Sequence, residues 1–429
     1  MLKLGIRKIV NSIKKIVGED NYSRYQLLKI QYNHQKALSR IKNKEIINVC
    51  FFLIHESVWK YEELYQLLKK DKRFNPIVLV CPYVMYGEEN MLNDMEKAYN
   101  AFKENGYNVI KALKDDSTWI DVKKELKPDL IFFTNPHNLT KPQYYIHNFK
   151  DCLTCYVPYN FGTSYMIKLF HGELFYNLVW KIFAETDIHK DYSRQVALNK
   201  GRNVIVTGFP GTDKLLDFNY NSDYAINWKH RNTKKIIWAP HHTIDDDKNF
   251  ISFSSFLIYH QYMFDLLKQF DEQIEIVFKP HPLLKVKLYE HQDWGKEKTD
   301  SYYNAWRNHL FGGLNEGNYI DLFKTSDAMI HDSGSFLIEY LYTEKPVLRT
   351  DRDDTICNRL NSFGKLAYQV HYIATNQLEI ELFIENIVLK GKKDIKEESR
   401  KEFKQKYLIP QNGMISSINI YNFIKKSIS

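Results

Sequence analysis

The sequence has no hydrophobic run long enough to cross a membrane, because no window approaches the roughly 18 to 20 apolar residues that a spanning helix needs. Its beginning also lacks a long apolar core with a small-residue cleavage site, so we expect no signal peptide. Cysteine is scarce, and the five residues are odd in number and widely spread. This usage indicates reduced thiols in a cytosol rather than a disulfide framework.

Glycine-rich phosphate-binding fingerprints are missing as well. No GxGxxG follows the first expected strand, which argues against dinucleotide-dependent enzymes and kinases. Cys152 and Cys155 form a single CxxC, but no further ligands stand at a spacing that suits zinc. We therefore expect neither a metal nor a cofactor.

An excess of one charge is confined to a single segment. The net charge of the chain is +8, and residues 1–44 alone hold eleven Lys or Arg against two acidic residues, so the remainder is about neutral. Such localised charge argues against an enzyme that binds nucleic acid in a basic groove. The charge distribution is typical of a basic segment that attaches an otherwise neutral protein to an anionic surface.

Within this basic segment the apolar residues recur on one face of an expected helix, while the lysines and arginines lie on the others. The apolar positions are Leu2, Ile6, Ile9, Val10, Ile13, Ile16 and Val17. Such a helix can lie in an anionic membrane interface, which predicts a cytoplasmic protein held peripherally on the inner face of the cell membrane. The alternative is a helix that docks on the body of the protein.

The rest of the chain alternates between strands and helices. Residues 170–186 are expected to be helical. Strands separated by helices pair in parallel, so the pattern predicts an α/β protein with two doubly wound, Rossmann-like domains. The strands are expected at 46–54, 76–81, 108–110, 129–134, 153–157, 235–239, 274–278, 318–320, 327–330 and 346–348.

At 429 residues the chain is long enough for two domains with full cores. We expect a basic amphipathic helical segment at 1–44, an acceptor-binding domain at 45–215, a nucleotide-binding domain at 225–390, and helices at 391–429 that pack back on the body. The run at 204–211 is typical of a strand followed by a Gly- and Pro-rich hinge, so we expect the boundary between the domains near residues 210–230. Two such domains facing a cleft make the GT-B architecture of many nucleotide-sugar transferases.

The functional prediction depends mainly on the run from His331 to Pro346. Its polar residues follow the strand at 327–330, at the edge where open α/β sheets bind their ligands. A serine can cap the helix that follows, and the N–H groups of the first turn suit a phosphate. The alternative is an ordinary capped helix. The candidate binding residues are His331, Asp332, Ser333, Gly334, Ser335 and Glu339, the last as an acceptor for a sugar hydroxyl.

Two other strands end in similar polar loops. His241 and His242 follow the strand at 235–239, and Lys279 and His281 follow the strand at 274–278 within Lys-Pro-His-Pro. If these loops converge on one sheet edge, a cation, imidazoles and hydroxyls surround a pyrophosphate. That set can stabilise a leaving group without a metal. A stiff turn with a surface histidine is the alternative for Lys-Pro-His-Pro.

These three motifs together resemble the CDP-glycerol glycerophosphotransferases, the teichoic-acid polymerase family. Asp332, Ser335 and Glu339 match the family's Thr-Asp-Tyr-Ser-Ser signature and its later Asp, and Lys345-Pro346 matches the closing pair. The run at 236–242 resembles the strand that ends in Ala-Pro, and 278–282 matches Lys-Pro-His-Pro. The shared order of the motifs, over roughly residues 200 to 350, is far more specific than any one of them.

The resemblance implies attack by an acceptor hydroxyl on the β-phosphorus of CDP-glycerol, with release of CMP. The implied partners are a CDP-linked donor and a polysaccharide or lipid-linked acceptor. A nucleotide-sugar glycosyltransferase, a CDP-ribitol-dependent relative and a non-catalytic CDP-binding scaffold remain as alternatives, because one family motif is altered. Where the family has Trp-His-Gly-Thr, this sequence keeps Gly162 and Thr163 but places Phe161 at the position of the histidine.

The general base that the family would supply is therefore missing at position 161. His55 is our candidate for the catalytic base, since it closes the first strand, faces the expected cleft and has Glu56 beside it to orient the ring. His171 and His137 are further candidates. A structural histidine is the alternative for each of them, because catalytic histidines are the minority.

Overall fold

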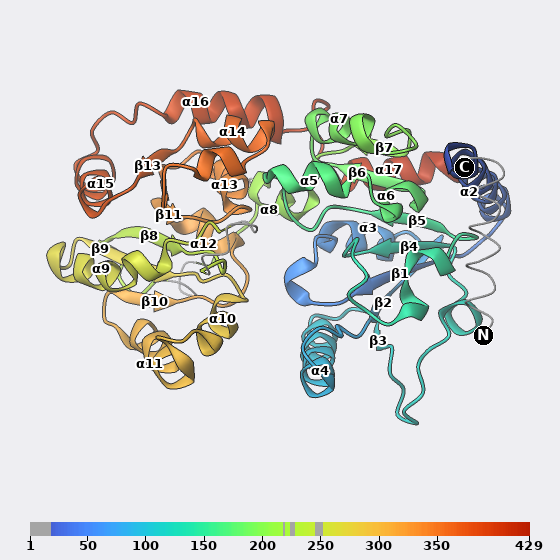
Figure 1. Cartoon of the computed structure of the whole chain (residues 1–429), viewed down its shortest axis with the longest axis horizontal. Coiled ribbons are helices and arrows are strands. Elements are labelled where there is room, and N and C mark those ends of the chain that lie inside the picture. The colour runs from blue at the N-terminus through green and yellow to red at the C-terminus, as the bar shows by residue number, and fades with distance from the viewer. Residues whose placement is uncertain (1–18, 218, 224–227, 245–251) are drawn as a thin grey trace. The chain divides into compact units, whose positions relative to one another are not determined.

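The computed structural model describes residues 19–217, 219–223, 228–244 and 252–429. The chain forms two compact units, drawn with their labelled elements in Figure 1. Unit 1 comprises the chain up to Asn160 together with Lys168–Gly211 and Pro410–Ser429, whereas unit 2 comprises Phe161–Ile167 and Thr212–Ile409. The expected acceptor domain at 45–215 thus contains a short segment that folds with the other unit, and the last twenty residues return to unit 1.

Unit 1 is built on a parallel sheet of seven strands in the order β3-β2-β1-β4-β5-β6-β7. The central strands are almost wholly buried, as expected for apolar runs covered on both faces. The strands are β1 (Ile47–Leu53), β2 (Phe74–Val80), β3 (Val109–Lys111), β4 (Leu130–Phe133), β5 (Leu153–Tyr156), β6 (Lys181–Ala184) and β7 (Val204–Val206).

The helices of this unit are α2 (Glu19–Lys42), α3 (Glu62–Lys70), α4 (Glu88–Glu104), α6 (Leu174–Leu178), α7 (Asp187–Val196) and α17 (Ser416–Ser427). Helix α5 (Tyr165–Phe170) spans the point at which the chain passes from unit 2 back to unit 1. Helix α2 packs on unit 1 through Ile30, Ala37 and Ile41, which are 0 to 5% exposed. Part of the expected basic segment therefore docks on the protein. The amphipathic stretch at 2–17 lies outside the described residues.

Unit 2 repeats the plan with six parallel strands in the order β10-β9-β8-β11-β12-β13. Its strands are β8 (Lys234–Ala239), β9 (Ile274–Phe278), β10 (Gly312–Leu314), β11 (Ala328–His331), β12 (Val347–Thr350) and β13 (Tyr372–Ala374). Its helices are α8 (Asp213–Leu216), α9 (Phe256–Gln269), α10 (Leu284–Glu290), α11 (Gly295–Asn308), α12 (Ile320–Thr325), α13 (Phe336–Glu339), α14 (Ser362–Tyr368), α15 (Gln377–Phe383) and α16 (Glu397–Phe403).

Each unit has its own aromatic-rich core. In unit 2, Trp238 of β8 stacks on Phe256 of α9 and on Phe278 of β9, with ring centroids 5.7 and 4.9 Å apart. Trp306 of α11 closes the same cluster at 5.6 Å from Trp238. These rings bury a large apolar area on one face of the sheet, which fixes the strands whose loops form the site.

Two expectations about secondary structure are wrong. Residues 318–320 are not a strand, because Ile320 begins helix α12 and the edge strand is β10, formed by Gly312–Leu314. Residues 170–186 are not one helix, since they contain α6 and the buried strand β6. In the described residues no helix is both long and apolar enough to span a bilayer.

In both sheets the order in which strands are added reverses beside the first strand of the unit. In each unit the chain adds two strands on one side of that strand and then crosses to the other side, so that β1 neighbours β4 and β8 neighbours β11. Loops at such a switch point diverge and leave room for a ligand at the carboxyl edge of the sheet. In unit 2 the loops after β8 and β11 are those with the histidines and the Ser-Gly-Ser sequence.

Candidate functional site

Three loops of unit 2 meet at the carboxyl edge of its sheet. His331 at the end of β11 pairs in register with Ala239 at the end of β8, and β9 lies on the other side of β8. The loops that follow these strands therefore start side by side. Backbone bonds fix two of them, since the His281 N–H donates to the Pro240 carbonyl oxygen over 3.1 Å.

The first feature of the site is a cluster of three imidazoles. The ring centroids of His241, His242 and His281 lie between 4.2 and 5.0 Å apart. Burial, and then the neighbouring imidazole of His242, lower the pKa of His241 and of His281 well below the usual value. His241 and His281 are therefore neutral at physiological pH.

Hydrogen bonds decide which nitrogen of two neutral rings carries the proton. Nδ1 of His281 accepts from the Leu283 N–H over 3.1 Å, and Nδ1 of His331 accepts from the Ser333 N–H over 3.1 Å. In a neutral ring the other nitrogen, Nε2, then carries the hydrogen. Both rings therefore carry a hydrogen on Nε2, the kind of donor that a phosphate oxygen requires, although His331 is itself fully buried beside His371.

The same three imidazoles are spaced for a metal ion, since their ligand nitrogens lie within 4.8 Å of one another. A metal needs a nitrogen lone pair, and in His281 the Leu283 N–H occupies the lone pair of Nδ1, which leaves the hydrogen on Nε2. Metal binding through Nε2 would require that bond to break. The tautomer that the Leu283 hydrogen bond implies therefore favours an anion over a cation.

Asp332, in the loop after β11, is hydrogen-bonded to the connection between β8 and α9. It is 1% exposed, and its two oxygens accept from the His241 N–H and from the N–H and hydroxyl of Ser255. The Ser255 hydroxyl also contacts the Thr350 hydroxyl on β12 at 2.8 Å. Burial raises the pKa of Asp332 to about 6, although these donors and the nearby Arg349 oppose the shift. Its carboxylate therefore positions loops, and its oxygens are directed at protein donors.

The Ser333-Gly334-Ser335 turn is held from two sides. The Ser333 hydroxyl accepts from the Phe336 N–H over 3.3 Å at the start of α13, so it is Ser333 rather than Ser335 that makes the capping contact. Arg349 is fully buried on β12 and donates through Nη1 to the Ser333 carbonyl oxygen over 3.2 Å.

Sequence reasoning missed Arg349. Nε of this guanidinium donates to Asp351 over 2.8 Å, and the Tyr368 hydroxyl donates to the other oxygen of Asp351 over 2.7 Å. The signal was present, since a charged residue stands inside an apolar strand, Val347-Leu348-Arg349. A buried arginine needs a compensating charge, and Asp351 supplies it through an ion pair over 2.8 Å.

Two of the residues that matched the family's signature contact their own chain. Glu339 is 2% exposed and accepts a hydrogen bond from the Tyr319 hydroxyl. Lys345 donates from Nζ to the carbonyl oxygens of Phe323, Lys324 and Ser326 over 2.5 to 2.9 Å, which satisfies the end of helix α12. The observed contacts of both residues are therefore structural.

Lys279 follows β9 and is 6% exposed. Its Nζ donates to the Gly317 carbonyl oxygen over 2.7 Å, in the loop before α12. Because an ammonium group has three N–H donors, this bond is compatible with an additional phosphate contact.

In unit 1 the candidate base His55 follows β1 and packs edge-on against Tyr83, with centroids 4.3 Å apart. Burial lowers the pKa of His55, and Asp94 opposes the shift. His55 is half-buried and neutral at physiological pH, so its imidazole can accept a proton.

The other two histidines of unit 1 differ from His55. His171 is 5% exposed, contacts the Ser193 hydroxyl through Nδ1 at 2.6 Å and stacks on Tyr176. Burial lowers the pKa of His171 to about 3, which describes a packed structural histidine. His137 packs against Phe170 at 5.1 Å and lines a small pocket.

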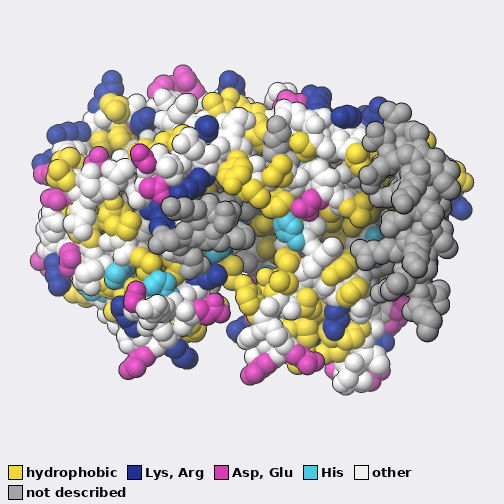
Figure 2. All heavy atoms as spheres, in the orientation of Figure 1, with side chains coloured by type: hydrophobic (Ala, Val, Ile, Leu, Met, Phe, Trp, Pro, Cys, Tyr) yellow, Lys and Arg dark blue, Asp and Glu magenta, His cyan; other side chains and the backbone are white. Residues whose placement is uncertain are grey.

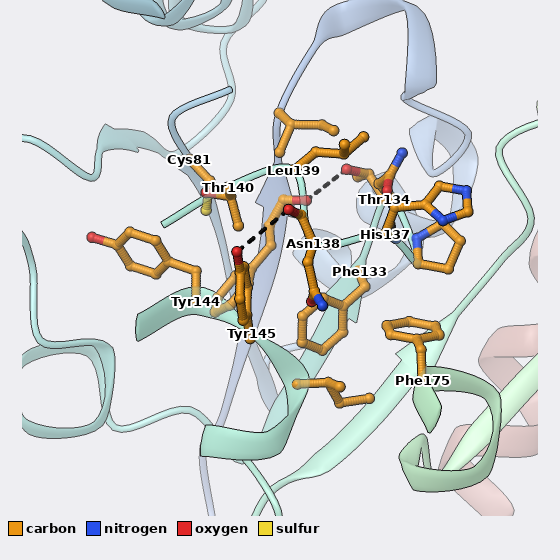
Figure 3. Close-up of a pocket in the computed structure, with 15 residues that line it drawn as sticks. Cys81, Phe133, Thr134, His137, Asn138, Leu139, Thr140, Tyr144, Tyr145 and Phe175 are labelled. Carbon is orange, nitrogen blue, oxygen red and sulfur yellow. Dashed lines mark hydrogen bonds between the residues drawn. The ribbon is translucent and has the colours of Figure 1, made fainter. Parts of the chain in front are cut away.

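That pocket lies at the switch point between β1 and β4 of unit 1 (Figure 3). Aromatic side chains such as Phe133 and Phe175 point into it beside Asn138, whose carbonyl oxygen accepts from Tyr145. Apolar side chains, among them Phe52, Ile54 and Leu139, make up much of its lining.

Four of the five thiols are buried in unit 1. Cys50, Cys81, Cys152 and Cys155 are all buried and unpaired as disulfides, and burial raises the pKa of each. Protonated buried thiols are poor nucleophiles and poor metal ligands.

On the face drawn in Figure 2, basic and acidic side chains are interspersed.

The sequence profile of CDP-Glycerol:Poly(glycerophosphate) glycerophosphotransferase matches residues 184–426, more than half of the chain. A comparison with curated protein sequences found no match.

Solved structures share the fold at low sequence identity. A variant of the wall teichoic acid polymerase TagF has a TM-score of 0.57 at 13% identity, over 99% of this chain and 97% of that one. The UDP co-structure of MnaA from S. aureus has a TM-score of 0.54 at 18% identity, over 89% and 96%. UDP-GlcNAc 2-epimerase from Neisseria meningitidis, bound to UDP-GlcNAc, has a TM-score of 0.54 at 15% identity, over 89% and 100%.

These likenesses show the fold alone, which is α/β with two parallel sheets and GT-B-like. The family rests on the sequence profile, whose span includes the histidine loops and the Ser-Gly-Ser turn. The chain belongs to the CDP-glycerol:poly(glycerophosphate) glycerophosphotransferase family.

Proposed function

We propose that this protein transfers a glycerophosphate, or a related polyol-phosphate unit, from CDP-glycerol to a surface-polysaccharide or lipid-linked acceptor and releases CMP. The observation that carries the proposal is the cluster of His241, His242 and His281 next to the Ser333–Ser335 turn, at the switch point of the unit 2 sheet. In support of the donor, a structure of the TagF variant was soaked with CDPG.

The chemistry follows from the donors at this edge. Attack by the acceptor hydroxyl on the β-phosphorus forms a new P–O bond and breaks the bond to the oxygen that links the two phosphates. The departing CMP then gains negative charge on that oxygen. Nε2–H of His281, with the other imidazoles and the lysine of the next loop, supplies donors where that charge develops.

The acceptor hydroxyl must also lose its proton. We assign this to His55 of unit 1, because its imidazole is neutral and only half-buried at the carboxyl edge of β1. Asp332 is assigned to holding the β8–α9 connection, which carries His241, against the loop after β11 rather than to contacting the nucleotide. His331, Ser333, Gly334 and Ser335 form the wall of the diphosphate site, and Glu339 supports it through Tyr319.

One observation supports a second candidate function. At position 161, where family members carry a histidine, Phe161 is 2% exposed and stacks at 6.1 Å on Phe363. A chain that lacks a base there suits either a nucleotide-sugar glycosyltransferase of capsule or cell-surface polysaccharide synthesis, or a scaffold that binds CDP without turnover.

The location of the protein is part of the same proposal. Five lysines or arginines and an apolar stripe within residues 1–18 support peripheral attachment to an anionic membrane surface, where a lipid-linked acceptor would be found.

A panel of donors tests the reaction. The full chain is incubated with CDP-glycerol, CDP-ribitol, UDP-glucose and UDP-GlcNAc, with and without a membrane fraction as acceptor, and the released nucleotide is identified by chromatography. We expect CMP from a CDP-polyol only when acceptor is present. Release of UDP would establish the glycosyltransferase instead, and donor binding without any release would establish the scaffold.

A further inference from the structure

The segment Phe161–Ile167 stands in the sequence between β5 and β6 of unit 1, but it folds as part of unit 2. Ser164 forms an antiparallel bridge with Leu360, just before α14. An excursion of this kind places residues from the middle of one domain's sequence against the other domain's ligand loops. Asn361, which follows Leu360, makes three further hydrogen bonds to the segment.

Asn361 clamps the segment with three hydrogen bonds. Its Nδ2 donates to the carbonyl oxygens of Gly162 and Ser164 over 2.6 and 3.1 Å, and its backbone N–H donates to that of Thr163 over 2.8 Å. Its Oδ1 meanwhile caps α14 by accepting from the Gly364 N–H over 2.8 Å. All polar groups of this side chain are therefore used.

The fit of the clamped segment is tight. A Cβ atom added to Gly364 would lie 2.5 Å from the Thr163 carbonyl oxygen, and one added to Gly162 would lie 2.6 Å from the side chain of Ile167. Neither position tolerates a larger residue without a shift. Thr163 is consequently held in one place, and it is 4% exposed.

From that place Thr163 reaches the Ser333–Ser335 turn. Its hydroxyl donates to the Gly334 carbonyl oxygen over 3.1 Å. A trans peptide is planar, with its C=O and N–H pointing in opposite directions. A bond that fixes the Gly334 carbonyl therefore also fixes the direction of the Ser335 N–H, on the far side of the same peptide.

We infer that Thr163, clamped by Asn361, is a positioning residue for the diphosphate site. It orients the Gly334–Ser335 peptide so that the turn presents N–H rather than carbonyl oxygen to a phosphate. This inference rests on the proposed function, because it requires that the turn bind the diphosphate of a cytidine nucleotide. It predicts an effect on phosphate recognition alone, not on the nucleoside.

The test compares CDP with cytidine. CDP affinity is measured by calorimetry and cytidine affinity by ligand-observed NMR, for the full chain and for Thr163→Val, which keeps the shape and removes the hydroxyl. We expect about a tenfold loss of CDP affinity, the size of one hydrogen bond, and no change for cytidine. Thr163→Ser, which keeps the donor, restores CDP binding.

Thr299→Val is the matched control, because Thr299 is also buried in unit 2 and its hydroxyl also donates to a carbonyl oxygen, that of Gly295, over 2.6 Å. It should leave both affinities unchanged. Asn361→Asp is a second, independent variant: it keeps the cap on Gly364 but loses both Nδ2 donors, and we expect the same CDP-selective loss.

The outcomes are distinct. Unchanged CDP affinity in Thr163→Val, or an equal loss of CDP and cytidine affinity, overturns the positioning role while the proposed function stands. If Thr163→Val does not fold, Asn361→Asp and Thr163→Ser decide by the same comparison. If the unaltered chain binds neither CDP nor cytidine, the proposed function fails and the inference fails with it.

Discussion

At the scale of the residue, the chemistry of the site depends on which nitrogen of each imidazole carries the hydrogen. His281 and His331 each accept a backbone N–H at Nδ1, and this leaves Nε2 as a donor. A neutral imidazole that donates from Nε2 binds a phosphate without the large desolvation cost of burying a cation. The same logic makes Asp332, surrounded by donors, a structural acceptor.

Asp332 should leave a signature in the pH dependence of stability. Burial raises its pKa to about 6 from 3.8, so the folded protein binds a proton that the unfolded chain releases. The contribution of Asp332 to stability therefore falls as pH rises from about 4 to about 6. The free energy of unfolding of the unaltered chain should fall by about 2 to 3 kcal/mol relative to Asp332→Asn over this range. Denaturant titrations of both proteins at several pH values give the comparison.

Parallel pH profiles for the two proteins would contradict this account. They would mean that the donors from His241 and Ser255 keep the carboxylate ionised in the folded state.

His55 is the residue whose removal should affect turnover rather than binding. We expect His55→Ala to lower kcat by about 100-fold to 10,000-fold, as for the loss of a general base, with little change in CDP affinity. Steady-state CMP release measures kcat, and calorimetry measures CDP affinity. His147→Ala, an exposed histidine of the same unit, serves as the control. A normal rate in His55→Ala would assign the base to another residue.

At the scale of the element, the last helix stabilises the first unit. Helix α17 packs against α3 and β6, since the Tyr421 hydroxyl donates to Asp71 over 2.6 Å and Phe423 contacts Phe183 at 5.7 Å. Ile420, Ile424 and Ile428 are fully buried in the unit 1 core. Unit 1 is thus closed by the final residues of the chain.

Ile424→Ala should therefore destabilise unit 1 by about 2 to 4 kcal/mol, the cost of a cavity at a fully buried isoleucine. Chemical denaturation measures the loss, and hydrogen exchange should show it in β1 to β7 but not in β8 to β13. Ile395→Ala, at a site 72% exposed, should change stability by less than about 0.5 kcal/mol. Equal loss of protection in both units would refute the assignment of α17 to unit 1 alone.

Element prediction failed where local signals were weakest. β10 is the tripeptide Gly312-Gly313-Leu314, which has little strand propensity and exists because β9 pairs with it. β6 is four residues that follow a tryptophan in an aromatic stretch, and it too is defined by its neighbours β5 and β7. The long apolar strands, in contrast, were predicted close to their observed ends.

At the scale of the whole molecule, the chain crosses between its units more often than a simple succession of two domains would require. It enters unit 2 at Phe161, leaves after Ile167, returns at Thr212 and ends in unit 1. Each crossing places residues of one sequence region beside the ligand loops or core of the other unit. Separate expression of the halves should for this reason yield incomplete folds.

Membrane attachment is likewise a property of the whole chain. Removing residues 1–18 deletes five lysines or arginines, each worth about 1 kcal/mol near an anionic surface. We expect the shortened protein to lose sedimentation with vesicles that contain phosphatidylglycerol and to keep CMP release with a soluble acceptor. Vesicles of neutral lipid should bind neither form. Undiminished binding of the shortened protein to anionic vesicles would place the anchor elsewhere.

The sequence by itself determined the class of fold, the positions of most strands along the chain and the three polar loops at strand ends. These features depend on hydrophobic periodicity and turn residues, which act over a few positions. Only the tertiary structure decided how the polar side chains are used. Asp332 and Glu339 face protein donors, Arg349 supports the turn, and Thr163 crosses to unit 2 to hold Gly334. These roles depend on hydrogen bonds between residues up to 171 positions apart, so a local pattern can mark a residue such as Arg349 but does not identify its partners.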